Sequence, residues 1–265
     1  MPRFGERPVE KAGETLELQE ARVKQHYTEG MKLRAAGKQE EARIHFQRTL
    51  QDVAFERDIL GSARFSALRK VRGLCFKQLS QIAKEQGDKA TALQRLGDAL
   101  ALDDSDVVMW HDLGCLSLDV GRLNVARCAF ERGLQLRPRH PLFLDKLCEV
   151  TYRIGDFAAC LASADLLLTL APEHPRGLVF KGLVLRRYPA TEDEGSDVLE
   201  SAREAEGGLG QEEVDRLRDF DRKRVRRDPA AAAQPRAIVL TKLNWRNLLE
   251  GILSVLPSSV PVSSL

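Results

Sequence analysis

The sequence predicts an all-α fold, a superhelix of stacked helical hairpins with a C-terminal helical extension. Three observations predict it: Gly87, Gly121 and Gly155 lie 34 residues apart, Pro138 and Pro172 repeat that interval, and a His-Pro pair follows each of those two prolines. A fixed period of this length is typical of repeats that each form one pair of antiparallel helices. We therefore expect successive hairpins to share an apolar core and to leave an inner surface open to another polypeptide.

The repeat at residues 107–140 follows the tetratricopeptide pattern, except that Ser117 stands where an aromatic residue is usual. Gly114 and Ala126 are small where the two helices cross closely, and larger side chains fill the space around the crossing. Pro138 is expected to end the second helix because proline has no amide hydrogen to donate. The residues expected to pack this repeat and the next are Trp110, Leu113, Gly114, Ala126, Phe130, Pro138, Leu144, Leu147 and Pro172.

The same frame predicts a tetratricopeptide-repeat solenoid (an α-solenoid) of roughly 4.5 repeats over residues 15–188, after a disordered lead-in at residues 1–14. The earliest copy is offset from the next by 50 residues instead of 34, so 16 extra residues are inserted within 51–72. Small and apolar residues keep helical spacing there, which indicates a lengthened second helix or a helical insertion.

Beyond the repeats, residues 189–236 predict an acidic loop, two charged helices at 196–206 and 211–227, and a linker. Few apolar residues lie on the charged helices, so we expect these helices to make few contacts with the solenoid or none. Residues 237–257 predict an amphipathic helix that is buried either as a cap on the last repeat or against another protein. Its docking face includes Trp245, Leu248, Leu249 and Ile252, and a disordered tail is expected at 258–265.

The composition is that of an ordinary globular chain. Its 41 basic and 39 acidic residues leave a net charge of +2, which provides no global field toward nucleic acid or an anionic membrane. The five cysteines show no C-x-x-C spacing and are expected to be reduced residues of the repeat helices. Neither a signal sequence nor a run of about 18 apolar residues is present, so we expect a soluble intracellular protein.

The sequence contains no motif for catalysis, so we expect neither enzymatic activity nor a cofactor. It lacks a glycine-rich phosphate loop, a G-x-S-x-G nucleophile elbow and an H-E-x-x-H metal motif. His111 and Cys115 lie four residues apart on one helical face, a spacing that zinc ligands also use. Two ligands are too few for a structural zinc site, and the repeat pattern explains both positions, so no metal is expected.

The candidate partner-binding surface is the concave face of the solenoid. The first helix of each repeat lines this face, with its second, fifth, ninth and twelfth positions pointing inward. Proteins that clamp the C-terminal carboxylate of a heat-shock chaperone place lysine and asparagine at the fifth and ninth positions. Gln81 stands where that asparagine is needed, which disfavours the chaperone clamp, and an ordinary hydrated surface stays the alternative. The candidate residues are Lys77, Gln81, Lys84, His111, Cys115, Asp145, Glu149 and Tyr152.

A basic cluster lies at the C-terminal end of the second predicted charged helix. It is formed by Arg222, Lys223, Arg224, Arg226 and Arg227. Such a cluster can be recognised by a nuclear-import receptor, or it can be a solvated helix end with cations at its C-terminus. Direct contact with nucleic acid is less favoured because no aromatic residues alternate with the charges.

Several stretches together resemble the N-terminal region of the calcineurin-binding protein cabin family, relatives of the third subunit of the yeast histone-regulation complex. The resemblance rests on the text at 102–110, 123–134, 138–140 and 177–181, with the insertion, the basic cluster and the Trp245 helix in the same order. It implies a non-catalytic scaffold in a nuclear histone-chaperone complex that assembles chromatin independently of replication, with chaperone subunits as partners. Family members are usually far longer, and the segment credited with calcineurin binding is missing, so phosphatase binding is not carried over.

Two other functions stay open from the sequence. The chain could be a cytosolic tetratricopeptide-repeat co-chaperone or trafficking adaptor, in which case the cytoplasm replaces the nucleus as its location. It could also be the repeat segment of a larger enzyme, although nothing after Pro257 leaves room for a catalytic domain. In each case the binding partner is another protein, and neither a membrane nor a small-molecule substrate is expected.

Overall fold

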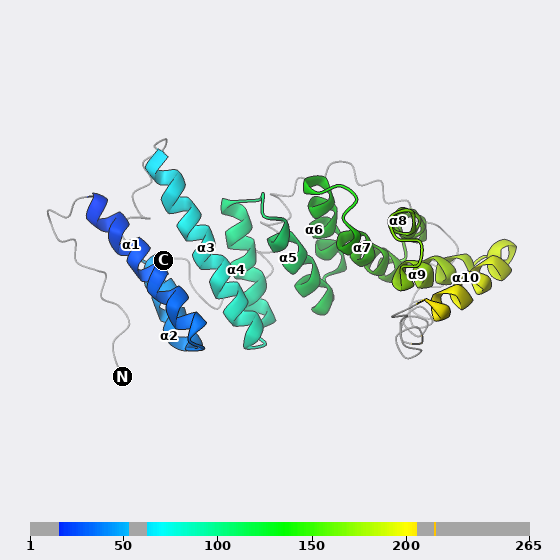
Figure 1. Ribbon diagram of the computed structural model, residues 1–265, viewed down its shortest axis with the longest axis horizontal. Coiled ribbons are helices and arrows are strands. Elements are labelled where there is room, and N and C mark those ends of the chain that lie inside the picture. Colours follow the sequence, from blue (N-terminus) through cyan, green and yellow to red (C-terminus); the bar gives the residue numbers. More distant parts are fainter. Residues whose placement is uncertain (1–15, 53–62, 206–214, 216–265) are drawn as a thin grey trace. The chain divides into compact units, whose positions relative to one another are not determined.

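The computed structural model describes residues 16–52, 63–205 and 215, and every regular element in these ranges is helical. The chain divides into two compact units, with the described residues up to Asp106 in the first and those from Val107 in the second. Figure 1 shows the helices following one another in antiparallel pairs, as the 34-residue period predicts. The all-α fold is therefore confirmed. Among the described helices, none combines the length and hydropathy needed to cross a lipid bilayer.

In the described part of the first unit there are two hairpins. They are formed by α1 (Leu16–Ala35) with α2 (Gln39–Leu50), and by α3 (Ala63–Glu85) with α4 (Lys89–Leu102). Phe46 from α2 lies against Cys75, Leu79 and Ile82 from α3, and all four side chains are buried. This apolar cluster joins the two hairpins because each buries a face that it could not bury alone.

The described residues of the second unit form three hairpins. They pair α5 (Val107–Asp119) with α6 (Leu123–Leu136), α7 (Pro141–Ile154) with α8 (Phe157–Leu170), and α9 (Pro175–Leu185) with α10 (Glu192–Glu204). A short 3₁₀ turn, η2 (Pro189–Thr191), leads into α10. The first helices also contact one another, α5 with α7 and α7 with α9. They therefore lie along one side of this unit.

The glycines at four of the hairpin turns share one backbone conformation. Gly37, Gly87, Gly121 and Gly155 have φ angles of 77°, 79°, 76° and 92°, in the left-handed region that favours glycine. After Gly155, the amide of Asp156 donates to the carbonyl of Thr151, and the residue after each of the other three glycines makes the same bond. Helices α1, α3, α5 and α7 thus end in the same Schellman turn, which aims the second helix back along the first.

One interpretation of the sequence predicts that the insertion between the first two repeats lengthens the second helix. The structure shows that it does not. Helix α2 ends at Leu50, and the following first helix, α3, begins at Ala63 and runs for 23 residues. The helical spacing detected near residue 63 belongs to this early start of α3, because helical periodicity does not reveal to which hairpin a segment belongs. Residues 53–62 lie outside the described residues.

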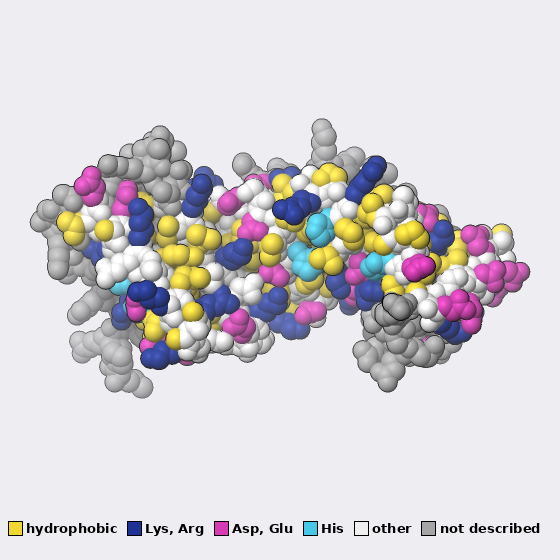
Figure 2. All heavy atoms as spheres, viewed as in Figure 1, with side chains coloured by type: hydrophobic (Ala, Val, Ile, Leu, Met, Phe, Trp, Pro, Cys, Tyr) yellow, Lys and Arg dark blue, Asp and Glu magenta, His cyan; other side chains and the backbone are white. Residues whose placement is uncertain are grey.

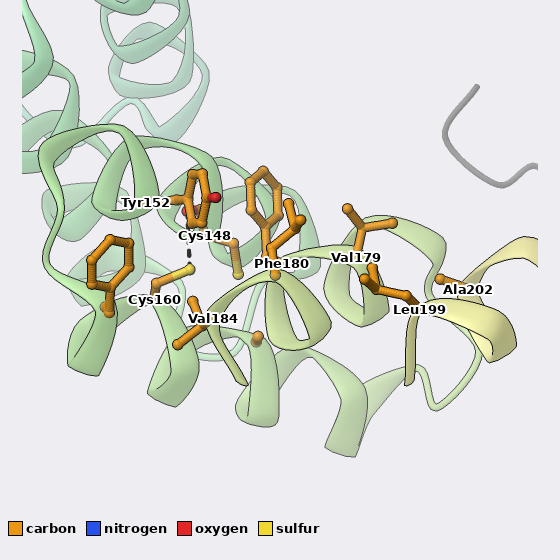
Figure 3. Close-up of a cluster of buried hydrophobic side chains, with 11 residues drawn as sticks. Cys148, Tyr152, Cys160, Val179, Phe180, Val184, Leu199 and Ala202 are labelled. Atoms are coloured by element: carbon orange, nitrogen blue, oxygen red, sulfur yellow. Dashed lines mark hydrogen bonds between the residues drawn. The ribbon is translucent and has the colours of Figure 1, made fainter. Parts of the chain in front are cut away.

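Helix α10 packs more closely than expected, since the sequence predicts a charged helix here with few contacts to the solenoid. Its residues Leu199 and Ala202 are buried in the cluster formed by α7, α8 and α9 (Figure 3). Two glycines permit this packing: a Cβ on Gly182 would meet the Gly195 carbonyl oxygen at 2.9 Å, and the converse contact is the same length. The acidic stretch Glu192–Glu194 is the first turn of α10, where carboxylates suit the positive helix end. The helical array therefore continues through Glu204.

Several predicted segments cannot be compared with the structure. The lead-in at 1–14, the charged helix at 211–227 apart from residue 215, the amphipathic helix at 237–257 and the tail at 258–265 lie outside the described residues. The basic cluster and the docking face with Trp245 fall in these segments.

Candidate functional site

The second unit positions its inner helices through tight contacts between glycines and aromatic rings. A Cβ on Gly114 would overlap the ring of Phe130, and a Cβ on Gly133 would overlap the ring of Phe143. The two rings meet edge to face, with centroids 6.2 Å apart. Gly133 and Phe143 were not singled out from the sequence, although the pair repeats the Gly114–Phe130 contact one helix later. The contacts fix α5, α6 and α7 against one another.

The other packing residues have the burial that their pattern implies, with two exceptions. The side chains of Trp110, Leu113, Ala126, Phe130, Leu144 and Leu147 are all buried. Pro138 and Pro172, in contrast, are exposed in the connections after α6 and α8. The two prolines therefore lie at the helix ends and outside the core, which suits a residue that interrupts a helix.

In the first unit, the candidate residues on α3 form no open carboxylate clamp. The ammonium group of Lys77 donates to Asp106 at 2.6 Å, so an acidic side chain of the same unit already occupies it. Gln81 is half-buried and Lys84 is exposed. This geometry adds to the missing asparagine in disfavouring recognition of a chaperone carboxylate.

On α7, the acidic candidate residues bind a cation of the next repeat. The guanidinium of Arg176, on α9, donates to Asp145 at 2.6 Å and to Glu149 at 2.8 Å. Lys146 and Arg153 lie 3.4 and 3.5 Å from Glu149. Asp145 is buried, which corrects its assignment to an open partner-binding surface. These charges join α7 to α9 and are already compensated.

Tyr152 also departs from the expected surface position. Its ring is 3% exposed and packs among Phe157, Phe180 and Cys148 in the core shown in Figure 3. The rings of Phe157 and Phe180 lie 5.7 and 5.8 Å from it between centroids. Because α9 stacks on α7, the twelfth position of α7 faces the next hairpin. Tyr152 is therefore a packing residue and is no longer a partner-binding candidate.

His111 and Cys115 remain at the surface of α5, and both are half-buried. The Cys115 sulfur lies 3.7 and 3.9 Å from the two ring nitrogens of His111. The His111 ring also packs edge-on against Phe143, with centroids 5.6 Å apart. Within the described ranges no three potential metal ligands gather. The arrangement thus provides a partly apolar surface held by ring packing.

Exposed aliphatic residues extend this surface. Val108 on α5 and Leu142 on α7 are 59% and 58% exposed, and both occupy the second position of a first helix. Val108 and Leu142 lie 34 residues apart, and this spacing is the sequence signal that marks them as equivalent positions of successive repeats. We call Val108, His111, Cys115 and Leu142 the inner patch. Figure 2 shows histidine beside hydrophobic side chains in this part of the second unit. Such a patch offers apolar contact together with polar side chains, as protein-binding surfaces do.

The buried cysteines contribute to packing only. Burial raises the pKa of the Cys75 and Cys160 thiols to about 12, and it raises that of Cys148 as well. Cys160 donates to the carbonyl of Cys148, and all five cysteines are free thiols. Protonated, enclosed thiols are poor nucleophiles and poor metal ligands.

Comparisons with known sequences identify relatives of the chain. The family model described as the CABIN1 N-terminal domain matches residues 20–187. Calcineurin-binding protein 1 from Arabidopsis thaliana is 33% identical over 168 residues, which are 62% of this chain and 9% of that protein. The chain thus spans less than a tenth of the length of this relative.

The chain resembles several solved structures. A crystal structure of YrrB, a TPR protein with an unusual peptide-binding site, has a TM-score of 0.56 at 12% identity and covers 72% of this chain and 94% of its own. A crystal structure of MamA has a TM-score of 0.53 at 18% identity and covers 67% and 94%. These likenesses establish the tetratricopeptide-repeat fold. The family match supports a protein-binding scaffold, and the chain belongs to the CABIN1 N-terminal domain family.

Proposed function

We propose that the chain is a non-catalytic scaffold subunit of a nuclear histone-chaperone complex that acts in replication-independent nucleosome assembly. The observation that supports this most is the family match over residues 20–187, which extends through nine of the described helices. The inner patch supplies a surface of suitable chemistry for a chaperone subunit.

The inner patch is the part of the proposal that mutation tests. A chain carrying Val108→Glu and Leu142→Glu is expected to lose most of its partners in a co-purification from nuclear extract, because each change introduces a charge into apolar contact. Gln135→Glu on α6 is the matched control, as Gln135 is exposed on a second helix. Circular dichroism checks that all variants fold equally. Wild-type capture without histones or a histone-chaperone subunit contradicts the proposal, and capture of a heat-shock chaperone instead favours the cytosolic co-chaperone.

The location in the nucleus is proposed from the basic cluster at 222–227. A fluorescently tagged chain is expected to accumulate in the nucleus, whereas a chain with Arg222, Lys223 and Arg224 all changed to alanine distributes into the cytoplasm, because import receptors bind clustered cations. Changing Arg216 and Arg218 to alanine removes charge nearby and is expected to leave nuclear accumulation intact. A wild-type chain confined to the cytoplasm would show that the cluster is only a solvated segment.

A further inference from the structure

The connection between α6 and α7 carries two exposed cations. It consists of residues 137–140, here called the arginine turn, in which Arg137 and Arg139 are both exposed. Neither guanidinium forms an ion pair or a hydrogen bond with another described residue. The equivalent positions after α8 are Ala171 and Glu173, so the stacking of hairpins does not require arginine at this place. Both cations are therefore available to a partner.

The backbone of the arginine turn is strained. Arg139 has a φ angle of 61°, in the left-handed region that residues with a Cβ rarely adopt, and it follows Pro138. A proline followed by a residue with positive φ is the pattern of a type II turn, in which glycine usually takes the second of these positions. In the equivalent turn after α8, Glu173 has no positive φ, and the amide of His174 donates to the carbonyl of Ala171 at 3.0 Å. Strain that glycine would relieve is more frequent at functional sites than elsewhere.

The arginine turn adjoins the inner patch. The ring of His140, the last residue of the turn, packs edge-on against Phe143 with centroids 5.5 Å apart. His111 of the inner patch packs against the same Phe143 ring at 5.6 Å, and Leu142 follows His140 by two residues. His174 uses its side chain to cap α9, whereas His140 makes no such bond to α7. The two histidines of this paragraph that contact Phe143 therefore connect the turn to the inner patch.

The acidic residues of α7 leave the charge of the arginine turn in place. Asp145 and Glu149 are bound by Arg176 of α9, as described above. The surface thus combines exposed aliphatic side chains with uncompensated positive charge at one edge. Figure 2 shows basic, histidine and hydrophobic side chains together on the visible face of the second unit.

We propose that the inner patch and the arginine turn together bind an acidic segment of a partner protein, in which aliphatic or aromatic residues are interspersed with carboxylates. The apolar residues of the segment contact Val108 and Leu142. Its carboxylates accept hydrogen bonds from Arg137 and Arg139, because a guanidinium presents paired N–H donors that match a carboxylate. A basic segment is excluded by repulsion from the same two cations. The inference rests on the proposed function in using the inner patch as the docking surface, and it adds the chemistry of the partner.

Selection from a displayed library of random short peptides tests the charge of the partner with the full chain. The library is first cleared on a chain carrying Arg137→Gln and Arg139→Gly, and the peptides that then bind the wild-type chain are sequenced. They are expected to be rich in aspartate and glutamate beside leucine, isoleucine or phenylalanine. Glycine suits the positive φ at position 139, so this variant is expected to melt at the same temperature as the wild-type chain or higher.

Fluorescence anisotropy with one enriched peptide measures the two parts of the surface separately. Changing Arg137 and Arg139 as above, or replacing the acidic residues of the peptide by their amides, is expected to weaken binding about tenfold or more. Leu142→Ser weakens it through lost apolar contact, and added sodium chloride weakens it by screening. The matched control, Arg186→Gln with Arg203→Gln, removes two charges from exposed positions elsewhere in the second unit and is expected to leave the affinity unchanged.

Several results would overturn the inference. These are recovery of no peptides, enrichment of basic or uncharged peptides, equal weakening by the control pair, and displacement of the peptide by a DNA oligonucleotide at lower concentration than by unlabelled peptide. The proposed function is tested separately by capture from nuclear extract. Undiminished capture of histone-chaperone subunits by the Arg137→Gln, Arg139→Gly chain removes this inference and leaves the function standing, whereas binding of acidic peptides without such capture does the reverse.

Discussion

Replacing Phe130 by alanine is expected to lower the free energy of unfolding by about 3–5 kcal/mol, because it empties the centre of a close-packed core. The Phe130 side chain is fully buried and joins α6 to α5 and α7 through Gly114 and Phe143. Urea denaturation of the full chain followed by circular dichroism measures the change. Leu142→Ala, at a position that is 58% exposed, is expected to cost under about 0.5 kcal/mol and serves as the control.

A double-mutant cycle with Gly114 tests the cause of that effect. Gly114→Ala alone is expected to cost about 1–3 kcal/mol, since its new methyl group overlaps the Phe130 ring. In the Phe130→Ala background the same methyl group enters vacated space. Gly114→Ala is therefore expected to cost much less there than in the wild-type chain. Strictly additive losses would show that the two residues are not in the contact described.

Replacing Asp156 by alanine is expected to cost about 3 kcal/mol, because one carboxylate both caps a helix and pairs with a buried cation. It accepts from the amide of Ala159 at 3.1 Å, which caps the start of α8, and from the guanidinium of Arg127 at 2.9 Å. The side chains of Arg127 and Asp156 are 10% and 7% exposed. Loss of the carboxylate therefore removes a helix cap and leaves a buried cation with only Glu131 as its partner. Thermal unfolding of the full chain measures the loss.

Asparagine at position 156 separates the two tasks. It caps a helix as well as aspartate does but cannot neutralise Arg127, so Asp156→Asn is expected to cost less than Asp156→Ala. Asp88→Ala measures the loss of a cap alone. Asp88 is exposed, and its side chain accepts from the amide of Thr91 at the start of α4. It is expected to cost about 1 kcal/mol. Equal losses for Asp156→Ala and Asp88→Ala would show that the buried ion pair contributes nothing.

The hairpins were predictable because their signals are local. Gly121 and Gly155 must adopt positive φ for the helix to end and turn, and no other residue type does so as easily. Gly114 and Ala126 are small because an aromatic ring and a second helix approach them within the same hairpin. All of these residues lie within one stretch of 34 consecutive positions, so the sequence alone predicts the helical hairpin.

The surface was harder to predict because it depends on how one hairpin lies on the next. Tyr152 satisfies the inward-facing position of α7, yet the stacking of α9 encloses it against Phe180. Asp145 is likewise covered by Arg176, which lies 31 residues later. Sequence spacing within one repeat contains no information about these contacts. A basic residue at the second position of the following first helix is the signal that could have revealed the second case.

Helix α10 was misjudged for a related reason. A low number of apolar residues suggested weak packing, but Gly182 and Gly195 let the backbones of α9 and α10 approach closely. Because the two helices approach closely, Leu199 and Ala202 are enough to pack one face of α10 against the core of the preceding helices. The glycine in the middle of α9 was visible in the sequence, but its partner across the hairpin could be recognised only with the structure.

Site-specific photo-cross-linking in nuclear extract tests the central claim most directly, since it identifies both the surface and its partner. With a photoreactive residue in place of Leu142, the chain is predicted to cross-link to a subunit of a histone-chaperone complex, whereas the same residue at Gln135 on α6 does not. Cross-links at 142 to unrelated proteins only, or equal cross-linking at both positions, would contradict the assignment of the inner patch as the docking surface of a chromatin-assembly scaffold.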